Sequence, residues 1–387
     1  MPKKEGFDFD RPINRRNTDS LKWDLFKEPE AISMWLADMD FYSPPQVREA
    51  LHNQVDHGVF GYTLPPRELK QEIASLLLKQ YHSKIQTDWI VWLPGLVTGL
   101  NVACRTAGGQ GDDVLTTVPV YPPFLSAPGY SDRNLVTVPL MDTGKKWIID
   151  FNRLEDAFTD RTRLFMLCNP HNPVGKMYTE KELSTLAAIC EKRDIIICSD
   201  EIHCDLILSK EKRHFPTAAT FPAMAEQTIT LMAPSKTFNL PGLGCAFAII
   251  PSSDLRGRFK KEKAGIVPEV NMLGYTAAQA AYRYGWPWLS ELLDYLRNNH
   301  AILKSYINKI PGLSMTDVEA TYLAWLNTSE TGITDPASFF KKAGVILSAG
   351  KDFTVPGSPG MEYLRLNFAC PKSMLIEALV RMSRALK

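Results

Sequence analysis

The chain has 387 residues, with 44 lysines and arginines against 43 aspartates and glutamates, so it lacks the basic field that attracts nucleic acid. No apolar run approaches the roughly 20 residues that cross a bilayer, and the two lysines near the N-terminus are not followed by the apolar stretch of a signal peptide. The seven cysteines show no zinc-binding spacing, so we expect a cytoplasmic protein with no metal site.

Apolar runs of strand length alternate with helix-like stretches through the middle of the chain. The strand candidates are residues 89–95, 112–121, 134–140, 161–170, 194–201, 227–236 and 244–251. Helical spacing follows the first of them, and a capping box of Thr179 and Glu182 opens a later amphipathic helix. Nearly continuous apolar strands separated by helices predict an α/β fold, with a mainly parallel sheet covered on both faces.

The pattern changes near residue 286. Residues 286–310 form one long amphipathic stretch, and shorter strand-like runs and a final helix over 372–386 follow it. We therefore predict a large domain over 47–285 and a smaller α+β domain over 286–387. Residues 1–46 are predicted to be an N-terminal segment that packs on the small domain or on a partner subunit.

Polar side chains gather where the predicted strands end. They include a lysine (Lys236), an aspartate (Asp200), an asparagine (Asn172), a histidine (His203) and a tyrosine (Tyr121). Ligands of open α/β sheets bind at the carboxyl ends of the strands. A buried lysine can form a Schiff base, and a buried aspartate can keep a pyridine nitrogen protonated. This set favours pyridoxal 5'-phosphate as the cofactor.

The same motifs resemble a known family. The segments "NPHNPVG", "SDEIHCD" and "APSKTFNLPG" resemble the fold-type-I pyridoxal-phosphate enzymes of the class I/II aminotransferase superfamily. Within it, "LKWD", "LADMDF", "GYTLP", "PVYPPF" and "LRLNFACP" resemble the MalY/PatB branch of cystathionine β-lyases and cystalysin-like carbon–sulfur lyases. The resemblance runs from about Leu21 to the C-terminus and implies a three-layer large domain.

The resemblance also implies how the cofactor ring is held. Lys236 matches the Schiff-base lysine that moves protons, and Asp200 matches the acid facing the pyridine nitrogen. Asn172 matches the partner of the 3-hydroxyl oxygen, and His203 stands near that oxygen, where many aminotransferases carry tyrosine. Tyr121 matches the aromatic residue that stacks on the ring. Lys236, Tyr121 and Asp200 are the implied catalytic residues.

The phosphate group is implied to lie at the start of the helix after Gly95. The backbone of Leu96 and Val97 and the hydroxyl of Ser235 are the implied ligands. Tyr62 matches a tyrosine that reaches the phosphate of the neighbouring subunit, so the resemblance implies a homodimer with shared active sites. Many aminotransferases place an arginine on the phosphate where this chain has Gly244.

Arg365, together with Asn172, matches the group that holds the substrate carboxylate. The implied activity is a carbon–sulfur β-lyase that converts cysteine conjugates such as cystathionine to pyruvate, ammonia and a thiol. The alternatives are an aminotransferase, which uses the same lysine, and a non-catalytic protein that binds a regulator. The residues alone do not identify the physiological substrate.

Each residue also has a structural interpretation. His203 is as typical of the core as of a site. Tyr121 also fits the core, although its place before two prolines at a strand end favours the site. Arg365 is typical of a structural ion pair as well. Trp35 and the two aspartates of "LADMD" either line the entrance or hold the N-terminal segment. The register of the motifs favours the functional interpretation.

Overall fold

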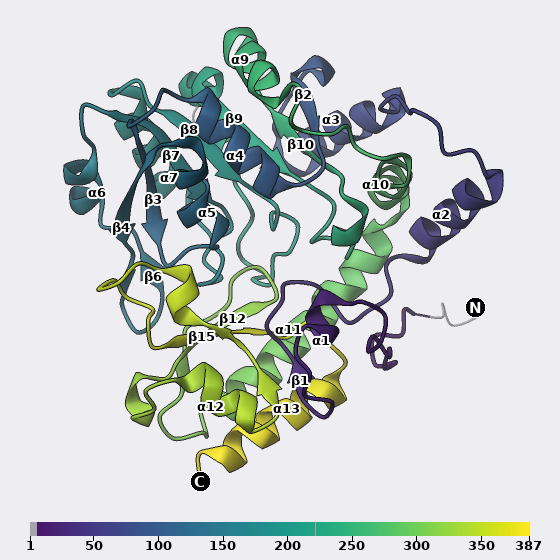
Figure 1. The fold of residues 1–387 in the computed structure, drawn as a ribbon, viewed down its shortest axis with the longest axis vertical. Helices are drawn as coiled ribbons and strands as arrows, with labels where there is room; N and C mark the ends of the chain where they lie inside the picture. Colours follow the sequence, from purple (N-terminus) through teal and green to yellow (C-terminus); the bar gives the residue numbers. More distant parts are fainter. Residues whose placement is uncertain (1–5, 221) are drawn as a thin grey trace.

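The computed structural model describes residues 6–220 and 222–387. A seven-stranded sheet forms the core of its larger part, in the upper half of Figure 1. The strand order is β2, β10, β9, β8, β7, β3, β4. Their bounds are Ile90–Leu93, Ala246–Ile249, Thr228–Met232, Ile196–Asp200, Thr162–Cys168, Asp113–Val118 and Asn134–Pro139. Neighbours from β9 to β4 pair in parallel, whereas β10 runs antiparallel to both β2 and β9. The predicted α/β class is confirmed.

Helices cover both faces of this sheet, because successive strand residues point to opposite sides. On β3, Val114 packs in the cluster that includes α4 (Leu96–Thr106) and α9 (Ser253–Lys263). Its neighbour Leu115 packs on the opposite face with α6 (Phe151–Ala157) and α7 (Glu180–Glu191). This two-sided burial explains why the strands are apolar throughout rather than alternating.

The capping box that the sequence predicts is present at the start of α7. The Glu182 backbone N–H donates to Thr179 Oγ1 at 3.2 Å, and the Thr179 N–H donates to a Glu182 carboxylate oxygen at 2.8 Å. Three further helices pack beside β2 and β10: α2 (Pro45–His57), α3 (Arg67–Tyr81) and α10 (Met272–Tyr284). Short elements complete this part: α5 (Pro123–Ser126), α8 (Thr217–Thr220), β5 (Met141–Asp142) and β6 (Trp147–Ile148).

The smaller domain is built on an antiparallel sheet of four strands in the order β11, β12, β15, β14. Their bounds are Ser314–Met315, Leu323–Asn327, Tyr363–Asn367 and Ser348–Ala349. Helices α11 (Trp286–Ile307), α12 (Pro336–Lys342) and α13 (Lys372–Ala385) accompany the sheet, and α11 extends from it toward α10 (Figure 1). The exact domain boundary at residue 286 stays a prediction.

The N-terminal segment lies against this smaller sheet. After α1 (Leu21–Asp24), β1 (Ile32–Ser33) pairs in parallel with β13 (Val345–Ile346). The chain then continues along β15, where the Asn367 N–H donates to the Met34 carbonyl at 2.8 Å. Residues 35–39 are thereby carried across to the ends of the large sheet. Within the described residues, no helix is long and apolar enough to cross a membrane.

Candidate active site

A cavity of about 220 Å³ lies at the carboxyl ends of β7, β8 and β9. Arg365 of β15 lines its opposite side. Nine of the residues named from the sequence line it: Leu96, Val97, Tyr121, Asn172, Asp200, His203, Ser235, Lys236 and Arg365. Tyr62 is outside this cavity, and its side chain is fully exposed in the single chain. The topology therefore brings together side chains that are up to 269 positions apart, from Leu96 to Arg365.

Lys236 follows β9 in a turn that points its amine into the cavity. The Phe238 N–H donates to the Pro234 carbonyl and the Leu240 N–H to the Ser235 carbonyl, both at 2.9 Å, which fixes this turn. Removal from water lowers the pKa of Lys236 to about 8, although the carboxylate of Asp38 opposes this shift. The neutral amine, which a nucleophile or a base requires, is therefore far more populated at neutral pH than in an exposed lysine.

Asp200 is the last residue of β8 and is almost completely buried. Its Oδ1 accepts the Ile202 N–H at 3.1 Å. Burial raises the pKa of Asp200 to about 7, while the Ile202 N–H favours the charged form. A cationic ring nitrogen placed against this carboxylate would favour its ionised form further.

Arg365 crosses the cavity toward Asn172. Its Nη1 donates to Asn172 Oδ1 at 3.2 Å, and its Nη2 donates to the Trp35 carbonyl at 2.8 Å. The guanidinium lies over the ring of Phe353, 4.7 Å from the centroid. Burial lowers the pKa of Arg365 to about 10, so it stays a cation at neutral pH. Its Nε has no hydrogen-bond partner among the described residues, which suits a carboxylate ligand.

His203 is buried beside the same cavity, edge-on to the ring of Tyr322 with the centroids 6.0 Å apart. Burial lowers its pKa to about 3, and the nearby cations of Lys236 and Arg365 act in the same direction. The imidazole is therefore neutral, and its Nδ1 has no partner within the described part of the chain. A buried polar atom without a partner is rare in a purely structural histidine.

The start of α4 offers backbone donors to an anion. Gly95 precedes the helix, and the first turn, with Leu96 and Val97, faces the cavity. The first N–H groups of a helix have no partner within it, which is the usual basis of phosphate binding. Gly244 lies opposite with φ +58°, and a Cβ there would come within 3.3 Å of the Pro94 carbonyl. An arginine in this left-handed backbone conformation would be strained.

Another side of the cavity, which we call the N-terminal wall (residues 35–39), presents backbone acceptors that the sequence did not identify. Three consecutive backbone carbonyl groups of this wall accept hydrogen bonds from side chains. Trp35 O accepts from Arg365 (2.8 Å), Leu36 O from Asn367 (2.6 Å), and Ala37 O from Lys236 (2.5 Å) and Tyr322 (3.0 Å). Because these acceptors are backbone atoms, no side-chain motif marks them.

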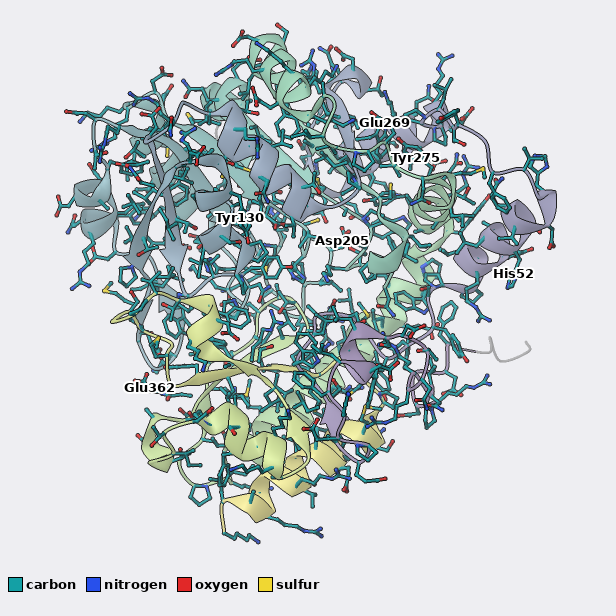
Figure 2. The ribbon with its side chains drawn as sticks, viewed as in Figure 1. His52, Tyr130, Asp205, Glu269, Tyr275 and Glu362 are labelled. Carbon is teal, nitrogen blue, oxygen red and sulfur yellow. The ribbon has the colours of Figure 1, made fainter. Side chains whose placement is uncertain are left out.

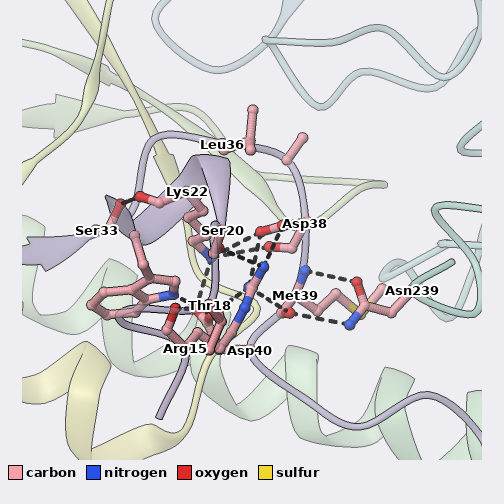
Figure 3. Close-up of polar contacts among 12 residues, drawn as sticks. Arg15, Thr18, Ser20, Lys22, Ser33, Leu36, Asp38, Met39, Asp40 and Asn239 are labelled. Atoms are coloured by element: carbon pink, nitrogen blue, oxygen red, sulfur yellow. Dashed lines mark hydrogen bonds and ion pairs between the residues drawn. The ribbon is translucent and has the colours of Figure 1, made fainter. Parts of the chain in front are cut away.

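A cluster of charges holds the N-terminal wall in place (Figure 3). The buried Asp40 carboxylate accepts from Lys22 at 2.7 Å, and from Trp23 and Arg15 at 2.8 Å each. Arg15 also donates to Asp38 at 2.7 Å. Lys22 is 1% exposed, so the positive charge of its amine is compensated by these carboxylates rather than by water. From the sequence, Asp38 and Asp40 could either line the entrance or hold the N-terminal segment. The structure shows that they hold the segment.

Asn239 fastens the same wall to the turn that carries Lys236. Its side chain accepts from the Met39 N–H at 3.0 Å and donates to the Met39 carbonyl at 3.1 Å (Figure 3). It also donates to the Phe41 carbonyl at 2.9 Å. Asp205, labelled near the middle of the view in Figure 2, contacts the same turn. Its carboxylate accepts from the Thr237 hydroxyl at 2.9 Å and from Tyr81.

Comparison with known proteins identifies the family. The model of aminotransferase class I and II matches residues 34–382. The chain belongs to this family. PatB of Bacillus subtilis (strain 168), named a cystathionine β-lyase, is 36% identical over 98% of this chain and 99% of its own. These findings confirm the recognition that the sequence supports, including its MalY/PatB branch.

Solved structures of this family extend the comparison. The crystal structure of OvoB covers 98% of this chain and 99% of its own, with a TM-score of 0.95 and 41% identity. Cystalysin from Treponema denticola covers 98% of each chain with a TM-score of 0.93 and 33% identity. The cystalysin structure contains pyridoxal 5'-phosphate. The unpartnered Nδ1 of His203 and the free N–H groups of α4 fit such a group in this chain.

Proposed function

We propose that the protein is a pyridoxal-phosphate-dependent carbon–sulfur β-lyase acting on cysteine conjugates such as cystathionine. The observation that carries the proposal is the cavity in which the amine of Lys236, with its lowered pKa, faces Asp200 and Arg365. The full-length similarity to PatB, which is named a cystathionine β-lyase, supports the choice of reaction.

The residues that would hold pyridoxal 5'-phosphate lie at or just after the ends of five strands of the large sheet, β2, β3, β7, β8 and β9. Lys236 would bind its aldehyde carbon, Asp200 its ring nitrogen, and Asn172 with His203 the oxygen at position 3. Tyr121 would stack on the ring. Leu96, Val97 and Ser235 would bind its phosphate. When bound, the cofactor supplies an electron sink for the pair left when a bond to the substrate Cα breaks.

Arg365 binds the substrate carboxylate with a second contact from Asn172, which fixes the direction of the Cα–H bond. Lys236, freed when the substrate amine takes its place, then takes the Cα proton as a neutral amine. The Cβ–S bond breaks with its electron pair on sulfur, so the thiol leaves. Overall, the cysteine conjugate and one water give the thiol, pyruvate and ammonia. Burial of the site excludes the bulk water that would compete for these hydrogen bonds.

The proposal includes a cytoplasmic homodimer. Residues 58–64 expose Val59, Phe60, Tyr62 and Leu64, with fractional exposures of 62%, 63%, 112% and 86%. Four large apolar side chains on one short segment favour a covered position. A second copy of this chain would cover them, and Tyr62 would then reach the partner's phosphate. Sedimentation of the wild-type protein tests the dimer. The affinity for the cofactor, compared between wild type and Tyr62→Phe, tests the contact of the Tyr62 hydroxyl with the phosphate.

The test of the function is release of pyruvate and thiol from cystathionine with no keto acid added, using purified protein and added cofactor. Stoichiometric pyruvate and thiol are expected from the wild type. Transfer of the amino group to an added keto acid, without thiol release, would instead identify an aminotransferase. A protein that does neither, and whose Lys236→Ala variant keeps its effect in cells, would have the regulator-binding role.

A further inference from the structure

A second cavity, of about 440 Å³, adjoins the candidate active site. The two cavities share Leu36, Tyr121 and Arg365. The second one lies between the N-terminal segment, helix α12 and the chain from Ile346 to Phe353. A molecule whose carboxylate lies on Arg365 therefore has open space on the far side of that arginine.

Aromatic rings line much of this second cavity. Trp35 and Phe26 meet edge to face, with centroids 5.6 Å apart and an angle of 82° between the planes. The indole N–H of Trp35 donates to the Lys22 carbonyl at 3.2 Å, which fixes the ring. Phe353 is buried beneath the guanidinium of Arg365, and Tyr121 completes the lining toward the first cavity.

The space arises because helix α12 presents small side chains to it. Ala337 and Ser338 line the cavity from the first turns of the helix. Lys341, one turn later, is already paired with Glu28 at 2.9 Å and lies over the ring of Phe26. The charge of Lys341 is therefore compensated within the chain. Asp335, Lys351 and Asp352 also line the cavity, but all three are exposed to solvent. The buried part of the lining, with Leu347 and Phe353, is aliphatic and aromatic.

We infer that this second cavity binds the thiol leaving group, and that the preferred leaving group is an arylalkyl or aryl thiol. The inference rests on the proposed lyase function. The substrate carboxylate and Cβ belong to one three-carbon unit, so a carboxylate at Arg365 places the β-substituent next to the shared boundary. A flat ring stacks on aromatic side chains and removes apolar surface from water, whereas a methyl group leaves the cavity unfilled.

The test compares kcat/KM for S-benzyl-L-cysteine and S-methyl-L-cysteine in three proteins. Wild type is expected to prefer the benzyl conjugate. Ala337→Trp fills the cavity and is expected to lower the benzyl-to-methyl ratio by at least about tenfold, mainly through KM. Lys342→Trp is the matched control, because Lys342 is exposed on the same helix and does not line the cavity. It should keep the wild-type ratio.

An unchanged ratio in Ala337→Trp, or an equal loss for both substrates, would overturn the inference. If the tryptophan variant does not fold, Ala337→Leu decides by the same ratio, with an expected reduction of roughly threefold. A wild type that cleaves the methyl conjugate with the higher kcat/KM would also contradict it, while leaving the lyase function intact. A wild type that releases no pyruvate from either substrate would instead refute the proposed function.

Discussion

The two main walls of the candidate active site are built in different ways. The strand-end wall (Tyr121, Asn172, Asp200 and Lys236) consists of side chains that follow buried strands, and β8 and β9 hold Asp200 and Lys236 firmly. The N-terminal wall (residues 35–39) has no such support. It presents backbone carbonyls and depends on the charges of Asp38 and Asp40. Chemistry therefore resides in one wall, while the other one closes and shapes the site.

The largest effect is expected in the strand-end wall. Lys236→Ala removes the amine that binds the cofactor and takes the Cα proton, so kcat/KM for cystathionine should fall at least about 10³-fold. Lys260→Ala, at an exposed position of α9, should keep the wild-type rate. Steady-state pyruvate release measures both. A Lys236→Ala enzyme within tenfold of wild type would be incompatible with the proposed role.

The N-terminal wall is tested by Asp40→Ala. This change leaves the buried Lys22 amine without its closest carboxylate, so the free energy of unfolding should fall by about 3–5 kcal/mol. Asp254→Ala breaks the largely exposed pair with Arg258 and should cost less than about 1 kcal/mol. Urea titration gives both values. Equal losses in the two variants would show that the wall does not depend on its charge cluster.

Arg365 joins the two walls, because it donates to Asn172 on one side and to the Trp35 carbonyl on the other. Lysine cannot make both contacts and bind a carboxylate, so Arg365→Lys should lower kcat/KM about 10²-fold, mostly by raising KM. Arg381→Lys changes an arginine paired with Glu377 on α13 and serves as the control. An unchanged KM in Arg365→Lys would remove this arginine from substrate binding.

A smaller effect is expected where the strand-end wall is supported from behind. Thr237→Val keeps the shape of the side chain but removes the hydroxyl that donates to the half-buried Asp205, at a cost of about 1–3 kcal/mol. Thr185→Val, at a helix position where the hydroxyl donates to the Lys181 carbonyl, should change stability by less than about 0.5 kcal/mol. Chemical denaturation that does not distinguish the two variants would contradict the supporting role of Asp205.

The difference between the walls also explains what could be predicted from sequence. Asp200 and Lys236 were found because an apolar strand ending in a charged residue is a local pattern, and parallel strands bring such ends together. The antiparallel direction of β10 was not predictable, since its apolar run has no direction. The carbonyls of Trp35, Leu36 and Ala37 leave no trace in side-chain composition.

The second cavity illustrates the same limit. Much of its lining comes from Phe26 and Trp35 in the N-terminal segment and from residues 335–353, and the pairing of β1 with β13 brings these two parts of the chain together. A parallel pairing of two short strands more than 300 residues apart has no local sequence signal. The proposed leaving-group pocket is therefore a property of the assembled fold, whereas the local motifs indicate the cofactor and leave lyase and aminotransferase as alternatives.

The most direct test of the central claim is to trap the cofactor on its lysine. Protein loaded with pyridoxal 5'-phosphate is reduced with borohydride, digested, and its peptides are sequenced by mass spectrometry. The modification is predicted on Lys236, within "APSKTFN". Modification of a different lysine in protein that still releases pyruvate, with Lys236 unmodified, would contradict the proposed chemistry of this site.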